Sequence, residues 1–250
     1  MTTQAGSTPR RAVSAPRAAA VWFAFHLSRH LKRRSFWLWV GVVVAFLVLG
    51  QVIARAPARF VAQGLIIQLG PLLALFFCTG VIRQEIEDQT LTYGFSRPVG
   101  RGWLYMARVL ATAAPVALLI GPAAIFLGLQ TGPEAAVRYA LAAVLAIAAY
   151  GGLFALIGQL IRWPAWFGLA FLIFWDVGVG LVPGFLGKMT LSTHVRTVAN
   201  LQLGIHEGAW MRFFEPPSES ASLITLVVFA LLTLWLGGVI VSRKEHRVTR

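Results

Sequence analysis

Long blocks of apolar residues dominate this chain of 250 residues, and they do not follow amphipathic spacing. A block of about 20 apolar residues, when helical, matches the roughly 30 Å hydrocarbon core of a bilayer. Only 12% of the residues are charged and 58% are hydrophobic, whereas a soluble domain usually carries about 25% charge. So few charges cannot cover a soluble surface of this size. The sequence therefore predicts an all-α, polytopic membrane protein.

We expect about six transmembrane helices within a membrane domain that covers residues 35–242. Pro115 and Pro122 fall inside the third of these, where neighbouring helices tolerate such kinks. Pro164 suits the first turn of the fifth. The six expected spans cover residues 36–54, 60–82, 103–129, 135–161, 164–183 and 222–241.

The amino-terminal region divides into two parts ahead of the first span. Residues 1–18 are rich in Ala, Ser, Thr, Pro and Arg and are interpreted as a disordered basic tail. Residues 19–34 carry one apolar side and one basic side, a pattern typical of an amphipathic helix lying in the cytoplasmic interface. The alternative is that these residues simply continue the first span. Residues 243–250 form a second basic tail.

The distribution of lysine and arginine predicts the orientation, because cytoplasmic loops carry an excess of these residues. With the amino end inside, 16 of the 22 basic residues fall on the inner side. Both ends are strongly basic, which requires an even number of spans. We therefore expect a multi-pass protein of the cell (inner or plasma) membrane with both termini in the cytoplasm.

The net charge of +13 could suggest nucleic acid as a partner. The basic residues instead flank apolar blocks, as they do in membrane proteins, and form no stripe with interleaved aromatic residues. We therefore expect no nucleic-acid partner. The single cysteine, Cys78, excludes an intrachain disulfide.

Two connections are longer than a turn: a cytoplasmic one over residues 83–102 and an external one over residues 184–221. Three of the nine acidic residues of the chain, Glu85, Glu87 and Asp88, lie within four positions of the cytoplasmic connection. Acids there contribute little to topology, since orientation follows lysine and arginine. The cluster fits either a partner with basic groups or a solvated loop whose acids pair with its own arginines.

The cytoplasmic connection resembles that of ABC-2 type ABC transporter permease subunits. That family carries a pattern close to Glu-x-Glu-x-Gly-Thr-Leu followed by Ser-x-Pro-Val-Ser-Arg between its second and third spans. Two positions depart from the pattern, since Gln89 replaces the glycine and Gly100 replaces the second serine. The matching residues are Glu85, Glu87, Thr90, Leu91, Ser96, Pro98, Val99 and Arg101.

The resemblance implies a role in transport driven by a separate subunit. In the family this connection is a coupling helix that docks on an ABC ATPase, so Glu85, Glu87, Thr90 and Leu91 would lie at that contact. Pro98 and Arg101 would set the turn into the third span. Two ATPase copies, which bind ATP-Mg, and a second permease copy or a related permease would complete an exporter. Spans one and five would meet across the permease interface.

The chain lacks the Gly-x-x-x-x-Gly-Lys-[Ser/Thr] phosphate loop. We therefore expect that it is not itself an enzyme and carries no cofactor, with ATP hydrolysis in the partner. Two rivals remain: a membrane anchor that recruits a cytoplasmic partner without transporting, and an intramembrane enzyme that would use Asp176 as acid or base. No residue pattern selects a substrate class.

Asp176 lies inside the fifth expected span, where an acid costs roughly 2.5–3.5 kcal/mol on insertion scales. Three interpretations are open. Asp176 lines a transport pathway; or the span is short or re-entrant and Asp176 is solvated; or Asp176 pairs with Arg138 at the outer end of span four. Gln51, Gln68 and Gln159 more simply form helix–helix hydrogen bonds. The external histidines His194 and His206 have no standard metal-site spacing, so we expect no metal.

Overall fold

The structure, a computed structural model, describes residues 15–80, 101–181, 185–201 and 217–243. This part of the chain is helical throughout apart from short connections and contains no strand, which confirms the all-α prediction. Five of its helices are long and apolar enough to cross a membrane. A shorter apolar helix, Pro164–Gly178, occupies the position of the fifth expected span.

The long helices lie close to the predicted spans, and three of them contain π-helical turns. The elements are α2 (Arg34–Leu47) with η1 (Val48–Ile53), α3 (Ala58–Gln63) with η2 (Gly64–Leu69) and α4 (Gly70–Cys78), α7 (Arg101–Leu129), α8 (Pro133–Leu160), α9 (Pro164–Ala170) with η3 (Phe171–Gly178) and the 3-10 turn η4 (Val179–Leu181), and α12 (Glu219–Arg243). Two short helices, α10 (Phe185–Lys188) and α11 (Leu191–Ala199), fall in the expected external connection.

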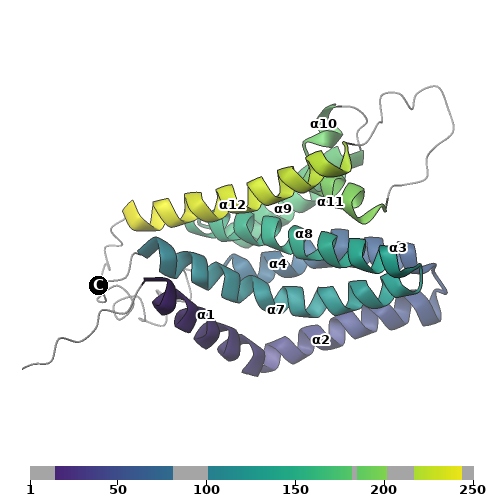
Figure 1. Cartoon of the computed structure of the whole chain (residues 1–250), viewed down its shortest axis with the longest axis horizontal. Coiled ribbons are helices and arrows are strands. Elements are labelled where there is room, and N and C mark those ends of the chain that lie inside the picture. The colour runs from purple at the N-terminus through teal and green to yellow at the C-terminus, as the bar shows by residue number, and fades with distance from the viewer. Residues whose placement is uncertain (1–14, 81–100, 182–184, 202–216, 244–250) are drawn as a thin grey trace, which may run out of the picture.

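The amino-terminal helix α1 (Ala15–Lys32) begins four residues before the predicted boundary at residue 19. The expected tail is therefore shorter than residues 1–18, because Ala15 and the run Ala18–Ala20 favour helix. At Arg33 the backbone is extended, with ψ of 139°, and this residue separates α1 from α2. Figure 1 shows α1 running at an angle to α2. The interpretation of residues 19–34 as a continuation of the first span is thus wrong.

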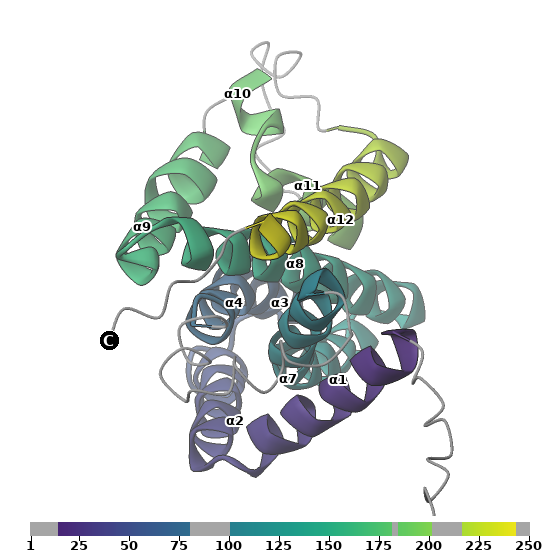
Figure 2. The same cartoon turned by 90° about the vertical axis from the view of Figure 1, so that its left-hand side faces the viewer.

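Helix α8 occupies the centre of the bundle. It contacts α7, α12, α4, α11 and α9, and Figure 2 shows these helices around it. The most apolar stretch of α8 is 61% buried inside the protein, against 6% for the helix Arg34–Ile53. Tyr150 and Phe154, in the second half of α8, are fully buried. The core is thus built around α8, and α2 lies at its edge.

Close packing of α8 on α4 depends on Gly158. A Cβ atom at this position would lie only 2.3 Å from the carbonyl oxygen of Thr79. Small residues let backbones approach in this way, and such contacts drive helix association in lipid.

The ends of the helices alternate between the two ends of the bundle. Figure 1 shows the start of α1, the end of α4, the start of α7 and the end of α12 at one end. The α7–α8 turn and helix α11 lie at the other end. The described helices that border residues 81–100 therefore place both attachment points of that segment at the same end as the start of α1.

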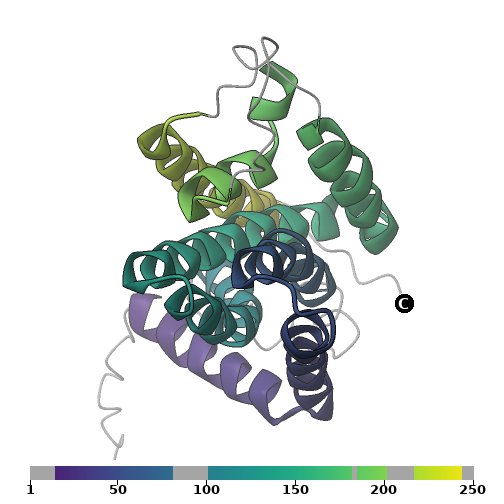
Figure 3. The ribbon, with the colours of Figure 1, turned by 90° about the vertical axis from the view of Figure 1, so that its right-hand side faces the viewer.

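Helices α2 and α9 share one flank of the bundle and expose apolar side chains. Figures 2 and 3 show them on either side of α4. Trp37 and Leu38 on α2, and Trp166 and Phe174 on the α9–η3 helix, are all more than half exposed. In water these aromatic and aliphatic groups would be unfavourable, so this flank suits lipid or another protein.

Candidate functional site at Asp176

The residues predicted to contact an ATPase fall largely outside the described residues. Those outside are Glu85, Glu87, Thr90, Leu91 and Pro98. Arg101 is the first residue of α7. The sequence pattern over residues 83–101 therefore stays a prediction.

Asp176, in contrast, lies among the described residues and is buried in the bundle. It lies in the π-helical segment η3 and is only 1% exposed. The interpretation of Asp176 as a solvated residue is therefore wrong, although its span is as short as that interpretation supposed. π-Helical turns are rare and concentrate at functional sites.

Both carboxylate oxygens of Asp176 accept hydrogen bonds from other elements. The Tyr150 hydroxyl of α8 donates to Oδ2 over 2.5 Å. The backbone N–H of Ser192 donates to Oδ1 over 3.1 Å. The Ser192 hydroxyl also donates to the backbone carbonyl of Asp176 over 2.9 Å. A buried carboxylate is tolerated only with such partners.

The contact with Ser192 places the carboxylate at the start of α11. Ser192 is the second residue of that helix, and the preceding Thr190 makes no side-chain cap. The first backbone N–H groups of a helix lack intrahelical partners and carry partial positive charge. Asp176 therefore supplies, from a neighbouring helix, the acceptor that α11 does not find locally. It fastens α11 to both η3 and α8.

Arg196, one turn along α11, provides the nearest positive charge. Burial lowers the pKa of Arg196, while the nearby Asp176 and Tyr150 act to raise it. The Nε atom of Arg196 is buried without a hydrogen-bond partner among the described residues. Asp176 and Arg196 thus balance each other's charge without a direct ion pair.

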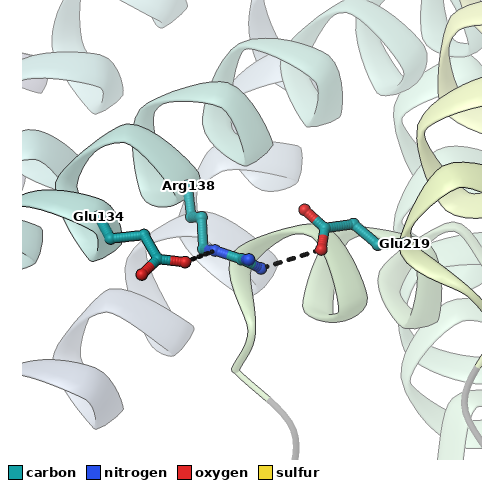
Figure 4. Close-up of polar contacts among 3 residues, drawn as sticks. All are labelled: Glu134, Arg138 and Glu219. Atoms are coloured by element: carbon teal, nitrogen blue, oxygen red, sulfur yellow. Dashed lines mark hydrogen bonds and ion pairs between the residues drawn. The ribbon is translucent and has the colours of Figure 1, made fainter.

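Arg138 does not pair with Asp176, so the third interpretation of Asp176 is also wrong. Its Nε atom lies 3.0 Å from Glu134 Oε1, and its Nη1 atom lies 3.1 Å from Glu219 Oε2 (Figure 4). Glu134 is on the same turn of α8, and Glu219 is at the start of α12. The guanidinium is thereby held at the end of the bundle, away from the buried carboxylate.

A second polar contact fastens α11 to α12. The Nδ1 atom of His194 lies 3.2 Å from the Ser222 hydroxyl, and both residues are buried. Burial lowers the pKa of His194, which favours the neutral ring. His206, its suggested companion in a metal site, lies outside the described residues. His194 thus acts as a packing and hydrogen-bonding residue of α11.

Sequence reasoning identified Asp176 but missed its partners. Tyr150 lies 26 positions before it and Ser192 16 positions after it. The available signal was Tyr150 itself, a hydroxyl-bearing side chain within a long run of alanine, glycine and leucine.

Gln51 behaves as expected, since its side-chain amide pairs with that of Gln130 at 2.7 Å. Gln159 of α8 faces the Tyr105 hydroxyl of α7, but the pair does not reach hydrogen-bond geometry.

At the other end of the bundle, a polar contact holds α1 to α7. Arg108 Nη1 lies 2.7 Å from Nδ1 of His26, and both residues are buried. Burial, together with the Arg108 guanidinium, lowers the pKa of His26 from 6.5 to about 3. The imidazole is therefore neutral and accepts from the arginine.

Neither the protein-family models nor the curated proteins searched include a match to this chain.

Proposed function

We propose that this chain is the membrane-spanning permease subunit of an ABC-2 type ABC transporter, acting as an exporter. The observation that carries the proposal is the sequence pattern from Glu85 to Arg101. It combines paired acids, a Thr-Leu step and a Pro turn ending in arginine, in the order found between the second and third spans of that family.

The arrangement of the described helices supports a cytoplasmic position for this pattern. The end of α4 and the start of α7 lie at the same end of the bundle as the start of α1 (Figure 1). The basic residues of α1 and of the break that follows it, including Arg29, Lys32 and Arg33, favour that end as the cytoplasmic one. In the proposal, α1 lies in the inner membrane interface, residues 83–101 contact the ATPase, and both termini are cytoplasmic.

Six crossings follow if the α9–η3 helix counts as the fifth. Its 15 residues give about 22 Å of helix at 1.5 Å per residue, less than the hydrocarbon thickness of about 30 Å. The 3-10 turn η4 lengthens it at the outer end. Helices α10 and α11 then cap this short span from outside, and Asp176 holds α11 there.

The exposed flank of α2 and α9 is the surface we assign to a second permease copy. Trp37 and Trp166 are 65% and 71% exposed, and their helices share one flank of the bundle, with α4 between them (Figures 2 and 3). A single bundle filled by its own side chains offers little room for a substrate path. Two copies meeting along this flank would create one between them.

The chain contributes no ATP chemistry in this proposal. ATP-Mg binds to the two partner ATPase subunits, and their closure selects one conformation of the permease pair. Residues 83–101 transmit the closure of the ATPase subunits to the helix bundle. They can do so because they join α4 to α7, and both of these helices pack on α8.

The test is to purify the chain together with a candidate ABC ATPase and to measure ATP turnover in lipid vesicles. We expect a stable complex whose turnover exceeds that of the ATPase alone. A membrane anchor would bind its partner but leave the turnover unchanged, and that result would contradict the proposal.

A further inference from the structure

A cavity of about 970 Å³, lined by both polar and apolar groups, lies at the end of the bundle that carries the α7–α8 turn. Its walls come from the start of α3, from the α7–α8 turn with the start of α8, and from the end of α11. The residues on which its chemistry depends are Arg59, Gln63, Glu134, Arg138, Tyr139 and Asn200. None of them belongs to the Asp176 site or to the predicted ATPase contact.

The two arginines at this cavity differ in how their charge is compensated. Arg138 is already bonded to Glu134 and Glu219 (Figure 4). Arg59 is exposed and contacts only the ring of Phe60, at 5.0 Å from its centroid, among the described residues. Arg59 is therefore a cation available to a ligand, and the planar guanidinium is suited to phosphate oxygens.

Tyr139 adds a hydroxyl to the cavity wall. The residue as a whole is 3% exposed and lines the cavity, while its hydroxyl oxygen stays accessible and makes no hydrogen bond within the described part of the chain. A phenolic hydroxyl can donate to a ligand oxygen. The side-chain amides of Gln63 and Asn200 offer further donors.

Glu134 places a negative charge in the same cavity. Its side chain is 81% exposed, and only Oε1 is used by Arg138. Its second oxygen is left for another donor. An anion alone would be repelled by this carboxylate, whereas a ligand with both a phosphate and an ammonium group would use both charges.

We propose that this cavity binds a zwitterionic phosphoethanolamine-type headgroup. The phosphate contacts Arg59 and the Tyr139 hydroxyl, and the ammonium contacts Glu134. Phe60, beside Arg59, is 52% exposed, and the cavity lies where the apolar helices end, at the depth of lipid headgroups. The inference does not depend on the proposed transport function or on an ATPase.

The test titrates the purified full-length chain, in neutral detergent, with three probes. They are a short-chain phosphatidylethanolamine, the matching phosphatidylglycerol, and deacylated glycerophosphoethanolamine. Binding is measured by isothermal titration calorimetry. We expect phosphatidylethanolamine to bind more tightly than phosphatidylglycerol, which lacks the ammonium group. Binding of the deacylated probe would show that the headgroup alone is enough for binding. Binding of the acylated probe only would show that the ligand is a membrane lipid. Either result supports recognition of the headgroup.

Variants assign the binding to this cavity. Arg59→Gln removes a charge-assisted contact and should weaken phosphatidylethanolamine binding about tenfold. Glu134→Gln should weaken the binding of phosphatidylethanolamine and strengthen that of phosphatidylglycerol, because the repulsion of its phosphate is removed. Tyr139→Phe should have a smaller effect than Arg59→Gln. Arg59 and Glu134 are both exposed, so neither change should disturb folding. Arg162→Gln, an exposed arginine at the opposite end, is the control. Equal binding of both lipids, or binding that survives Arg59→Gln, would overturn the proposal.

Discussion

At the scale of single residues, Asp176 shows how one buried acid can organise a neighbouring segment. Its two oxygens accept from Tyr150 on α8 and from Ser192 on α11, so three elements meet at one carboxylate. Because both partners are buried, neither can turn to water if the carboxylate is lost. The acid thus anchors helix α11 to α8 and η3.

Asp176→Asn should destabilise the protein. The amide has one acceptor instead of two, and Arg196 loses its nearest negative charge, so we expect a loss of about 1–3 kcal/mol in the free energy of unfolding. Thermal unfolding in detergent measures the effect. Glu134→Gln, which breaks the exposed ion pair with Arg138, should lower the free energy of unfolding by less than about 1 kcal/mol. Equal losses for the two variants would contradict the role of Asp176.

The pH dependence of α1 packing should follow His26. Its pKa is about 3 when α1 is packed on α7 and 6.5 otherwise, so the unpacked state binds more protons between these values. The stabilisation is therefore complete above pH 6.5 and is lost as the pH falls toward 3. The midpoint temperature of thermal unfolding should fall when the pH is lowered from 7.5 to 5. In the His26→Phe variant this fall should be smaller. An identical pH profile for the variant would contradict the assignment.

At the scale of elements, hydropathy located the spans because lipid selects long apolar helices regardless of their partners. Helices near residues 36–54, 60–82, 103–129, 135–161 and 222–241 appear as predicted. Other features depend on contacts distant in sequence and could not be predicted. The break at Arg33, the π-helical turns and the shortness of the α9–η3 helix leave no mark in the hydropathy of the sequence. The partners of Asp176 were missed for the same reason.

The packing of α8 on α4 gives a prediction at this scale. Gly158→Ala places a Cβ atom against the Thr79 carbonyl, so the backbones must separate, at a cost of roughly 1–3 kcal/mol in unfolding free energy. Gly121→Ala is the matched control, because its Cβ atom would meet no atom within 4 Å. That change should be neutral or stabilise by up to about 1 kcal/mol. Similar effects from both substitutions would argue against close packing at Gly158.

At the scale of the whole molecule, orientation and assembly follow from where charge and apolar surface lie. The basic residues of α1 mark one end, and the exposed flank of α2 and α9 marks one side. The orientation was predicted from lysine and arginine alone, and the positions of the helix ends are consistent with it. The second copy and the ATPase stay proposals that experiments on the intact complex can test.

Cysteine labelling tests the orientation. The single native cysteine, Cys78, is fully buried, so Ser96→Cys and Ser218→Cys each introduce one reactive site. In intact cells, a membrane-impermeant maleimide should label Ser218→Cys and should label Ser96→Cys only after permeabilisation. The reverse pattern would place residues 83–101 outside and exclude a cytoplasmic ATPase contact.

The most direct measurement of the central claim is ATP turnover by the reconstituted permease–ATPase complex with Glu87→Arg. If residues 83–101 bind the ATPase, this charge reversal should abolish the stimulated ATP turnover and reduce the amount of ATPase that copurifies with the chain. Glu245→Arg, a reversal in the carboxyl-terminal tail outside the pattern, should leave both unchanged. Full assembly and undiminished turnover in Glu87→Arg would contradict the assignment of this chain as an ATPase-coupled permease.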